Sequence, residues 1–558
     1  MSNLPPHILK AFEAVVGPDN VSDEDFVVNC HDWMGLGADP STRTLLGKAP
    51  AAVVMPGSTE EVAGVVKVCN QYKLKFKAHS TGYGNYSGVG TKGSISIDLC
   101  RMKGLEIDPE SRMAIIQPYT TAGELVSEAH KHQLMCHIIG AGPIHSPLAS
   151  ATSFVGVGVA GNHTSINSRN MLSLEWVTPE GEIVRIGSSG SDAGWFTGEG
   201  PGPGFRGMIR GLYGAAGGLG VFTKIGIKLY PWAGPKTLEW SGPHPYRGTP
   251  PPENFATYQL DWDNWEDATK ATQMMKNSKA VAFINRMPPA AVGHCLTATN
   301  REYYDLQRTG KLPDIATKAN AVGWSVTTMA WTKAQFDWNE AVLNKILAET
   351  NGRKMDISER ERDILTAAVL TSHYVARFNR MGDCAGVSMG VLDSINLIPE
   401  VVKRTNDDIG DKETKAGGKM MEVDTEQNWM WLSEGRHFWT ENNPASTRSF
   451  VKNIVVCVDF ILSSFISNEK KPLGAALFVH GEASDLFGPK LGHPNKWMRK
   501  VKNTWDPNNL SDSKHFIQPE AAKESKAWPI AKKIFFHPWG KPIFRKILTK
   551  EFGKDDPK

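Results

Sequence analysis

The chain has 558 residues, which is too long for a single hydrophobic core and predicts roughly two or three domains. Its composition is 41% apolar and 22% charged, which excludes a disordered chain. The net charge is +3, yet residues 521–558 hold ten Lys or Arg against four Asp or Glu, so the rest of the chain sums to −3. That balance argues against nucleic-acid binding by the main body.

The seven cysteines are dispersed and none forms a C-x-x-C pair, so the sequence predicts no iron–sulfur or zinc cluster and no metal. An odd, dispersed set suits a reducing compartment. The segment from Met1 to His7 lacks the charged start and apolar stretch of a signal peptide, and the chain has no run of about 20 apolar residues. We therefore expect a cytoplasmic protein.

The first part of the chain alternates helix and strand signals. A short amphipathic helix is predicted over 6–16, within a segment, 1–48, that otherwise indicates little. A second helix is predicted where Ser58 or Thr59 can cap its start. Residues 53–125 then give the order strand, helix, strand, Gly-rich loop, strand, strand, helix, which predicts an α+β domain.

A glycine-rich loop lies between two short predicted strands, 73–78 and 94–99. Glycine lets backbone N–H groups converge on a phosphate without side chains in the way. The dinucleotide fingerprint of doubly wound folds runs through G-x-G-x-x-G into a helix, but a strand follows here, so a helix-terminus site is excluded. A plain hairpin turn remains the alternative. The glycines of the loop are Gly82, Gly84, Gly88 and Gly90.

Residues 140–170 are rich in glycine and in small hydroxyl-bearing side chains. Such a stretch lets a flat ring and its ribityl chain lie against backbone, with Ser and Thr hydroxyls available for hydrogen bonds. A tight loop of a β-rich domain is the alternative. Residues 188–205 are predicted to form a loop, because the Pro-Gly-Pro-Gly run 201–204 cannot continue a helix.

A Pro- and Gly-rich stretch, 231–252, is typical of a linker and is the best domain boundary in the chain. Beyond it, a strand is predicted over 323–329 and a helix over 332–349. This second region is dense in tryptophan, which we expect mainly in the core, with one or two side chains lining an apolar pocket. The tryptophans are Trp262, Trp265, Trp324, Trp331, Trp338, Trp429, Trp431 and Trp439.

Seven pieces of sequence carry a family resemblance. They are Val53 to Val62, His79 to Gly84, Ile97 to Met102, Ile116 to Leu125, Glu175 to Glu182, Gly217 to Lys224 and, after the middle of the chain, Asp506 to Leu510. Their order and spacing resemble the flavin-binding domain of the vanillyl alcohol oxidase/p-cresol methylhydroxylase (PCMH) superfamily. The resemblance covers roughly half of the chain and extends only weakly to the middle.

The resemblance implies an α+β fold, in which a two-part PCMH-type FAD-binding domain is joined to an α+β cap that covers the flavin ring and forms the substrate pocket. The implied divisions are an N-terminal segment (1–48), the FAD-binding domain (49–232), the cap (233–470), a return to the FAD-binding domain (471–520) and a basic amphipathic tail (521–558).

FAD is the cofactor that the resemblance implies. No covalent tether has a clear counterpart near 382–389, with Tyr374 a weak candidate, so we expect non-covalent FAD. The residues expected to bind it are His79, Ser80, Thr81, Gly82, Tyr83, Gly84, Asn85, Ser87, Pro118, Gly142, Pro143, Ser150, Thr152, Ser153, Gly156, Gly158, Asn162, Gly220 and Val221, the last two at the adenine end.

Titratable residues of the second region are candidates for catalysis. A cation near the flavin would stabilise its reduced, anionic ring, and a His, Tyr or carboxylate could accept the substrate's hydroxyl proton. Solvated loop charges are the alternative. The candidates are Tyr374, Arg377, His437, His480 and Glu482.

The leading hypothesis is an FAD-dependent oxidoreductase that takes hydride from a hydroxyl-bearing or activated alkyl carbon of an organic, aromatic or alicyclic substrate. Family members that oxidise phenols hold the phenolate with a Tyr-Arg pair, which the strand 475–480 lacks, so a phenolate is disfavoured. A 2-hydroxy acid dehydrogenase subunit of the glycolate or lactate type stays open, although the metal-binding G-H-x-G-D-G-N-x-H stretch of such relatives is not found. An FAD-holding electron-transfer subunit also stays open.

The expected partners are a small-molecule substrate, an electron-acceptor protein and further copies of the chain, but no nucleic acid. Residues 528–552 interleave Lys and Arg with apolar side chains, a pattern that suits peripheral docking on an anionic membrane or on a partner. Packing of this tail on its own chain is the alternative.

Overall fold

The computed structural model describes most of the chain. The longer described ranges are 4–31, 49–82, 87–139, 142–153, 158–187, 217–242, 247–285, 322–371, 391–400, 427–431, 437–441 and 488–512. The shorter ones are 156, 206–209, 214–215, 296–299, 301–302, 305–306, 309–311, 485 and 519–520. The predicted tail 528–552 lies outside them.

The N-terminal layer is a four-stranded sheet in the order β1-β2-β4-β3. Strands β2 (Ala52–Val54), β4 (Ile95–Asp98) and β3 (Phe76–His79) are parallel, and β1 (Val21–Ser22) is antiparallel to β2. Because β3 and β4 are parallel neighbours, the glycine-rich loop between them is a crossover, and the hairpin alternative is wrong.

Two helices cover this sheet and share its apolar core. They are α1 (Pro6–Val16) and α4 (Thr59–Tyr72), and both lie where the sequence predicts them. Between them lie a 3₁₀ turn (Pro18–Asn20) and a third, shorter helix, α2 (Asp25–Cys30). Ser58 is the cap of α4, because its Oγ accepts the Glu61 N–H at 3.1 Å. The Thr59 hydroxyl instead donates to buried Glu175 at 2.7 Å and so ties the helix to the next sheet.

The second layer is a five-stranded antiparallel sheet in the order β5-β6-β10-β8-β9. Its strands are β5 (Leu105–Asp108), β6 (Met113–Ile116), β10 (Val221–Lys228), β8 (Met171–Val177) and β9 (Ile183–Ile186). Between the glycine-rich loop and helix α5 the structure has three strands, β4, β5 and β6. The sequence predicts only two strands in that interval. Helix α5 (Ala122–Lys131) begins with a capping box between Thr121 and Glu124.

Short elements join this sheet to the candidate site. They are α6 (Pro147–Thr152), α7 (Gly161–Thr164), a 3₁₀ turn (Asn167–Asn170), α8 (Arg206–Ile209) and the two-stranded pair β7 (Leu134–Met135) and β11 (Tyr230–Pro231).

The third layer is a seven-stranded sheet, called the cap sheet here, in the order β15-β12-β14-β13-β17-β18-β16. Its strands are β12 (Phe255–Trp262), β13 (Phe283–Asn285), β14 (Val322–Met329), β15 (Arg353–Lys354), β16 (Val391–Ser394), β17 (Gln427–Trp431) and β18 (His437–Glu441). Its helices are α9 (Trp265–Ser278), α13 (Lys333–Glu349), α14 (Glu359–Thr371) and a 3₁₀ turn, Ile395–Leu397. The strand and helix predicted over 323–329 and 332–349 are confirmed.

The tryptophans of this region divide between core and surface. Trp262 and Trp324 are fully buried, as expected, whereas Trp331 and Trp338 are 55% and 54% exposed.

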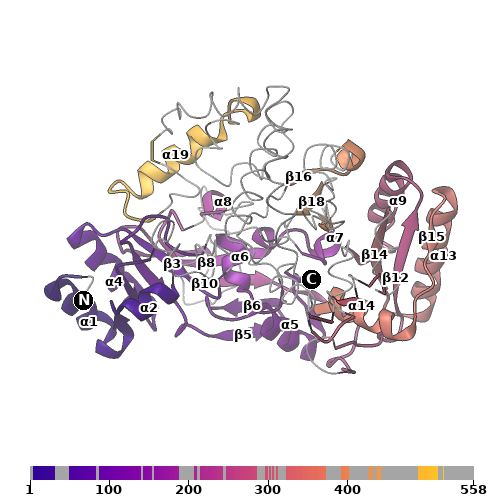
Figure 1. Cartoon of the computed structure of the whole chain (residues 1–558), viewed down its shortest axis with the longest axis horizontal. Helices are drawn as coiled ribbons and strands as arrows, with labels where there is room; N and C mark the ends of the chain where they lie inside the picture. The colour runs from indigo at the N-terminus through magenta and orange to yellow at the C-terminus, as the bar shows by residue number, and fades with distance from the viewer. Residues whose placement is uncertain are drawn as a thin grey trace.

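The two faces of the cap sheet differ in chemistry. The outer face carries Leu260, Trp262 and Trp324, which pack into an apolar core that includes residues of α9 and α13, and Figure 1 shows α13 beyond the sheet. The inner face packs against residues of the second layer, and Phe255 contacts Trp232 with ring centroids 5.3 Å apart. Strand register places on this face Phe255, Thr257, Gln259, Phe283, Asn285, Ser325 and Thr327.

The C-terminal described segment returns to the N-terminal sheet. A 3₁₀ turn (Gly488–Leu491) leads to α19 (Pro494–Trp505), drawn in yellow above the first two sheets in Figure 1. The Phe76 N–H donates to the Leu510 carbonyl at 2.9 Å, and the Asp512 N–H donates to the Phe76 carbonyl at 2.8 Å. Residues 510–512 thus lie along β3. Among the described helices, none is both long and apolar enough to cross a membrane.

Candidate functional site

Three segments predicted to bind the cofactor meet beyond the end of β3. The Ser146 N–H donates to Thr81 Oγ1 at 2.9 Å, and His145 Nδ1–H donates to the Gly82 carbonyl at 2.9 Å. The Ser146 hydroxyl donates to the Pro118 carbonyl at 2.6 Å. The structure therefore brings the loop after His79, Pro118 and the loop at 142–146 into direct contact.

Positive φ angles allow the chain to turn at this meeting point. Gly82 has φ +81° and Gly142 has φ +115°, a region that side-chain-bearing residues rarely adopt. Both glycines lie within predicted cofactor-binding stretches, so glycine at these positions permits the backbone conformation of each loop.

The hydroxyls of α6 that are predicted to bind the cofactor also hydrogen-bond within the chain. Ser150 Oγ donates to the Pro147 carbonyl at 3.0 Å and Thr152 Oγ1 donates to the Leu148 carbonyl at 2.9 Å. Asn167 Nδ2 donates to both Pro147 and Ser150. Both hydroxyl hydrogens are thus donated to backbone carbonyls of the preceding turn, a contact that Ser and Thr side chains commonly make in helices.

Two further predicted positions serve packing. A Cβ at Gly158 would lie 1.7 Å from the Ile138 carbonyl oxygen, and one at Gly156 would lie 2.6 Å from Asn167 Cβ.

The Gly220 N–H donates to Ser511 Oγ at 2.8 Å, and Val221 is fully buried in β10. The backbone N–H of Gly220, expected at the adenine end, is thus bound to the returning C-terminal segment.

Asn162 lies next to the cap sheet. It is buried in α7, and its Nδ2 donates at 2.7 Å to the carbonyl of Val281, just before β13. Among the described residues its Oδ1 is buried without a hydrogen-bond partner, as are Asn167 Oδ1 and Ser168 Oγ. This group of polar atoms therefore has unused hydrogen-bonding capacity next to the predicted site.

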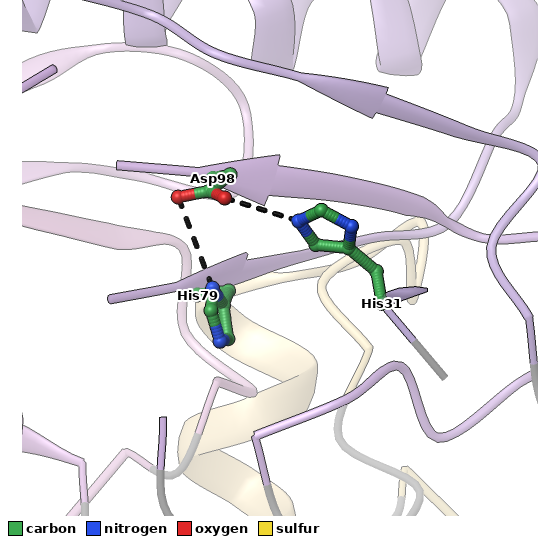
Figure 2. A group of neighbouring side chains, drawn as sticks. All are labelled: His31, His79 and Asp98. Carbon is green, nitrogen blue, oxygen red and sulfur yellow. Dashed lines mark hydrogen bonds and ion pairs between the residues drawn. The ribbon is translucent and has the colours of Figure 1, made fainter. Parts of the chain in front are cut away.

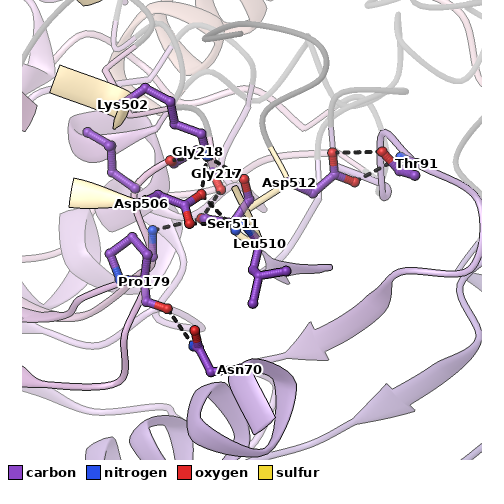
Figure 3. A network of polar contacts seen from close by, with 12 residues as sticks. Asn70, Thr91, Pro179, Gly217, Gly218, Lys502, Asp506, Leu510, Ser511 and Asp512 are labelled. Carbon is purple, nitrogen blue, oxygen red and sulfur yellow. Dashed lines mark hydrogen bonds and ion pairs between the residues drawn. The ribbon is translucent and has the colours of Figure 1, made fainter. Parts of the chain in front are cut away.

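The C-terminal return closes the far half of the glycine-rich loop (Figure 3). Asp512 Oδ2 accepts the Gly90 and Thr91 N–H groups at 2.7 and 2.8 Å. The sequence predicts the return from Asp506 to Leu510 but gives no signal for Asp512, whose partners are more than 400 residues away.

A buried lysine holds this return in place. Lys502 is 0% exposed, and its ammonium donates to the Gly218 carbonyl at 2.9 Å, to the Ser511 carbonyl at 2.6 Å and to the Asp506 carboxylate. Burial lowers the pKa of Lys502, and Asp506 opposes that effect. The sequence signal that could have predicted this ion pair is the spacing of Lys502 and Asp506, because residues four apart lie on the same face of a helix.

Two histidines and an aspartate form a second polar group at the ends of β3 and β4 (Figure 2). His31 Nε2 lies 3.0 Å from Asp98 Oδ2, and His79 Nδ1 lies 3.8 Å from Asp98 Oδ1. The hydrogen bond to Asp98 raises the pKa of His31. Burial alone would raise the pKa of Asp98, but the hydrogen bond with His31 and the charge of the nearby His79 ring hold it well below its usual range. The sequence predicts only His79 of these three as a site residue.

The remaining predicted site residues stay predictions. Tyr83, Gly84 and Asn85, together with Tyr374, Arg377, His480 and Glu482, lie outside the described residues. His437 begins β18, and only its backbone is described. The structure therefore assigns no catalytic base.

Comparison with known proteins agrees with this geometry. Residues 50–187 match the family described as an FAD binding domain. The chain is 28% identical over 235 residues to the 4-cresol dehydrogenase [hydroxylating] flavoprotein subunit of Pseudomonas putida, and 26% identical over 230 residues to a probable mitochondrial D-lactate dehydrogenase of Danio rerio. Each match covers 40% of this chain and 42% of the relative, so the chain spans about two fifths of the length of these curated relatives.

The fold extends beyond the range of these sequence matches. The structure of p-cresol methylhydroxylase with substrate bound superposes with a TM-score of 0.67 at 17% identity, covering 91% of this chain and 96% of that one. At such identity the likeness shows a shared fold, including the cap sheet. Residues 50–187 therefore match an FAD binding domain, and over the rest of the chain the likeness to solved structures is one of fold.

Proposed function

We propose that the protein is an FAD-dependent oxidoreductase that removes hydride from a hydroxyl-bearing or activated alkyl carbon of an organic substrate. The observation that carries this proposal is the convergence of residues 79–82, Pro118 and residues 142–146 inside the matched FAD binding domain. Bound FAD would supply two-electron oxidation, and the chain would bind it, orient it and limit its contact with water.

The polar atoms of the site fit this cofactor. Asn162 Oδ1, Asn167 Oδ1 and Ser168 Oγ are buried and unpaired among the described residues. The ribityl hydroxyls and ring imide of FAD are hydrogen-bond donors, so such acceptors would be satisfied by it. We propose that FAD is held non-covalently.

The inner face of the cap sheet supports a polar substrate. Gln259, Ser325 and Asn285 lie side by side across β12, β14 and β13, and each is at most 3% exposed. Within this row the Ser325 hydroxyl donates to Gln259 Oε1 at 2.6 Å, so these two polar groups are held on this face by a hydrogen bond to each other. We propose that this row faces the hydroxyl-bearing part of the substrate.

A 2-hydroxy acid dehydrogenase is the second candidate. The match to a probable D-lactate dehydrogenase favours it, at an identity close to that of the 4-cresol dehydrogenase match. Because the Pseudomonas putida relative is a flavoprotein subunit, an electron-accepting protein partner is also proposed. Self-association, and docking through residues 528–552 on a membrane or on a partner, complete the proposed interactions.

Anaerobic titration of the purified protein tests both candidates. We expect bound FAD that acid precipitation releases, and bleaching of the visible flavin band by a member of an aromatic and alicyclic alcohol panel. Bleaching by D-lactate or glycolate alone would select the second candidate. A protein that binds no FAD, or whose FAD is reduced by no small molecule in either panel, would contradict the proposed enzyme.

A substitution at Thr81 tests whether its contact with Ser146 supports FAD binding. Thr81→Val removes the oxygen that accepts the Ser146 N–H, so the two loops lose about 1 kcal/mol of mutual stabilisation. We expect the Kd for FAD to rise roughly fivefold in equilibrium dialysis. The control is Thr504→Val, an exposed position whose hydroxyl donates within its own helix, and it should leave the Kd unchanged.

A further inference from the structure

Three chain segments bring two imidazoles and a carboxylate to one point. His79 and Asp98 end the parallel strands β3 and β4 and are paired in register, so their side chains leave the sheet on the same side. His31 directly follows α2 and approaches from the N-terminal segment, as Figure 2 shows. One ligand atom from each residue lies within 4.8 Å of the other two, and the side chains are only 8–19% exposed.

The hydrogen bonds of His31 define what can occupy the space between it and Asp98. Its Nδ1 lies 3.1 Å from the Val27 carbonyl, which can only accept, so Nδ1 carries a hydrogen. In the neutral ring, Nε2 would then present a lone pair to the Asp98 carboxylate 3.0 Å away. Two acceptors at that distance repel each other, so either a hydrogen or a metal ion must lie between them.

The arrangement has the features of a built metal site. Imidazole nitrogen and carboxylate oxygen are preferred ligands of Zn²⁺ and related divalent transition metals. A metal-binding histidine usually donates its other ring N–H to a backbone carbonyl, as His31 does to Val27, which fixes the ring and its tautomer. Asp98 Oδ1 likewise accepts the Cys100 N–H at 3.0 Å, so the carboxylate is held in place as well.

We propose that His31, His79 and Asp98 bind one divalent transition-metal ion of the zinc type, with a solvent molecule completing the coordination. The ion joins the N-terminal segment to the carboxyl ends of β3 and β4, and so fixes the residue at which the glycine-rich loop begins. This site is independent of the proposed oxidation chemistry. Because His79 is also a predicted cofactor-binding residue, the test uses metal content and not activity.

Metal binding to the purified full-length chain provides the test. After chelation and desalting, we expect the protein to bind one Co²⁺ per chain with visible ligand-field absorption, and Zn²⁺ to displace it stoichiometrically. Zn²⁺ at about 100 times its Kd should shift the unfolding equilibrium roughly 100-fold toward the folded state. His31→Gln and Asp98→Asn should each abolish the Co²⁺ spectrum while circular dichroism confirms folding.

A matched exposed pair serves as control. His132 Nε2 lies 3.9 Å from Glu128 Oε1 on the surface of the same domain, and His132→Gln should leave both the stoichiometry and the spectrum unchanged. If the wild-type chain binds no Co²⁺ or Zn²⁺, a hydrogen lies between His31 and Asp98 and the proposal is wrong. It is equally wrong if His31→Gln retains the wild-type spectrum, whatever the FAD content of the preparation.

Discussion

Buried polar side chains occur both around the predicted cofactor loops and on the inner face of the cap sheet, but they are satisfied differently. Around the loops, side chains bind backbone atoms of distant segments, as Ser146 binds Pro118 and Asp512 binds Gly90. On the cap sheet, hydroxyls bind one another: Thr257 contacts Thr327 at 3.0 Å and Thr366 at 2.9 Å. The first arrangement fixes loop positions, whereas the second can change by exchange of side chains over an unchanged backbone.

The largest effect is expected at the C-terminal return. Lys502→Met leaves the Asp506 carboxylate buried without its cation, so we expect a loss of about 3–5 kcal/mol in the free energy of unfolding, measured by urea denaturation. The exposed Lys496→Met on the same helix should change that free energy by no more than about 0.5 kcal/mol. If the two variants lose the same free energy of unfolding, the buried lysine does not hold the C-terminal return in place.

A histidine at the junction of the two regions gives a pH dependence. His130 stacks on Trp232 with ring centroids 4.3 Å apart, and burial lowers its pKa to about 4. Between pH 6.5 and 4 the unfolded chain binds more protons there than the folded chain, so stability falls as the pH falls through this window. The contribution that is lost is about 3 kcal/mol.

Replacement of the ring checks this assignment. His130→Phe keeps an aromatic group on Trp232 and removes the titration, so its urea midpoint should fall less than that of the wild type between pH 7 and pH 4. Identical pH profiles would show that other groups control acid unfolding.

The third effect concerns cofactor binding. Asp512→Asn weakens the charged hydrogen bonds to the Gly90 and Thr91 N–H groups, and we expect the Kd for FAD to rise about tenfold. Asp108 also accepts two backbone N–H groups, from Glu110 and Ser111, but in an exposed turn, so Asp108→Asn is the matched control and should bind FAD normally. If both variants bind FAD normally, the C-terminal return does not contribute to cofactor binding.

The smallest effect is expected on the cap sheet. Thr257→Val should cost about 1–2 kcal/mol, because it leaves the Thr327 and Thr366 hydroxyls with fewer partners. The triple change to Val at positions 257, 327 and 366 should cost less than the sum of the single changes, since no unpaired hydroxyl remains. Strict additivity in urea denaturation would contradict the view that this face tolerates exchange.

Local signals in the sequence predict much of the fold. Ser58 caps α4 and Thr332 caps α13 because a hydroxyl before an apolar helical repeat satisfies the first N–H groups. The parallel pairing of β3 and β4 was not predictable in this way, since a glycine-rich loop alone is compatible with a hairpin or a crossover.

The candidate site was predictable only where the family resemblance identified loops. It identified Thr81 and Pro118 but not the residues that hold them, such as Ser146 and His145. The group of His31, His79 and Asp98 depends on the register of two strands and on the position of α2, neither of which a local pattern determines. The hydroxyls of Ser150 and Thr152 donate within their own helix, and their predicted role as cofactor ligands stays a prediction.

The bond between Asp512 and Gly90 joins residues 422 positions apart. At about 5–20 residues added per second, the ribosome would need roughly 20–85 s to deliver the aspartate after the glycine emerges. During translation the glycine-rich crossover therefore lacks its hydrogen bond to Asp512 for that time. Slow codons or chaperone occupancy in the intervening stretch should affect the yield of folded protein more than similar changes near either end.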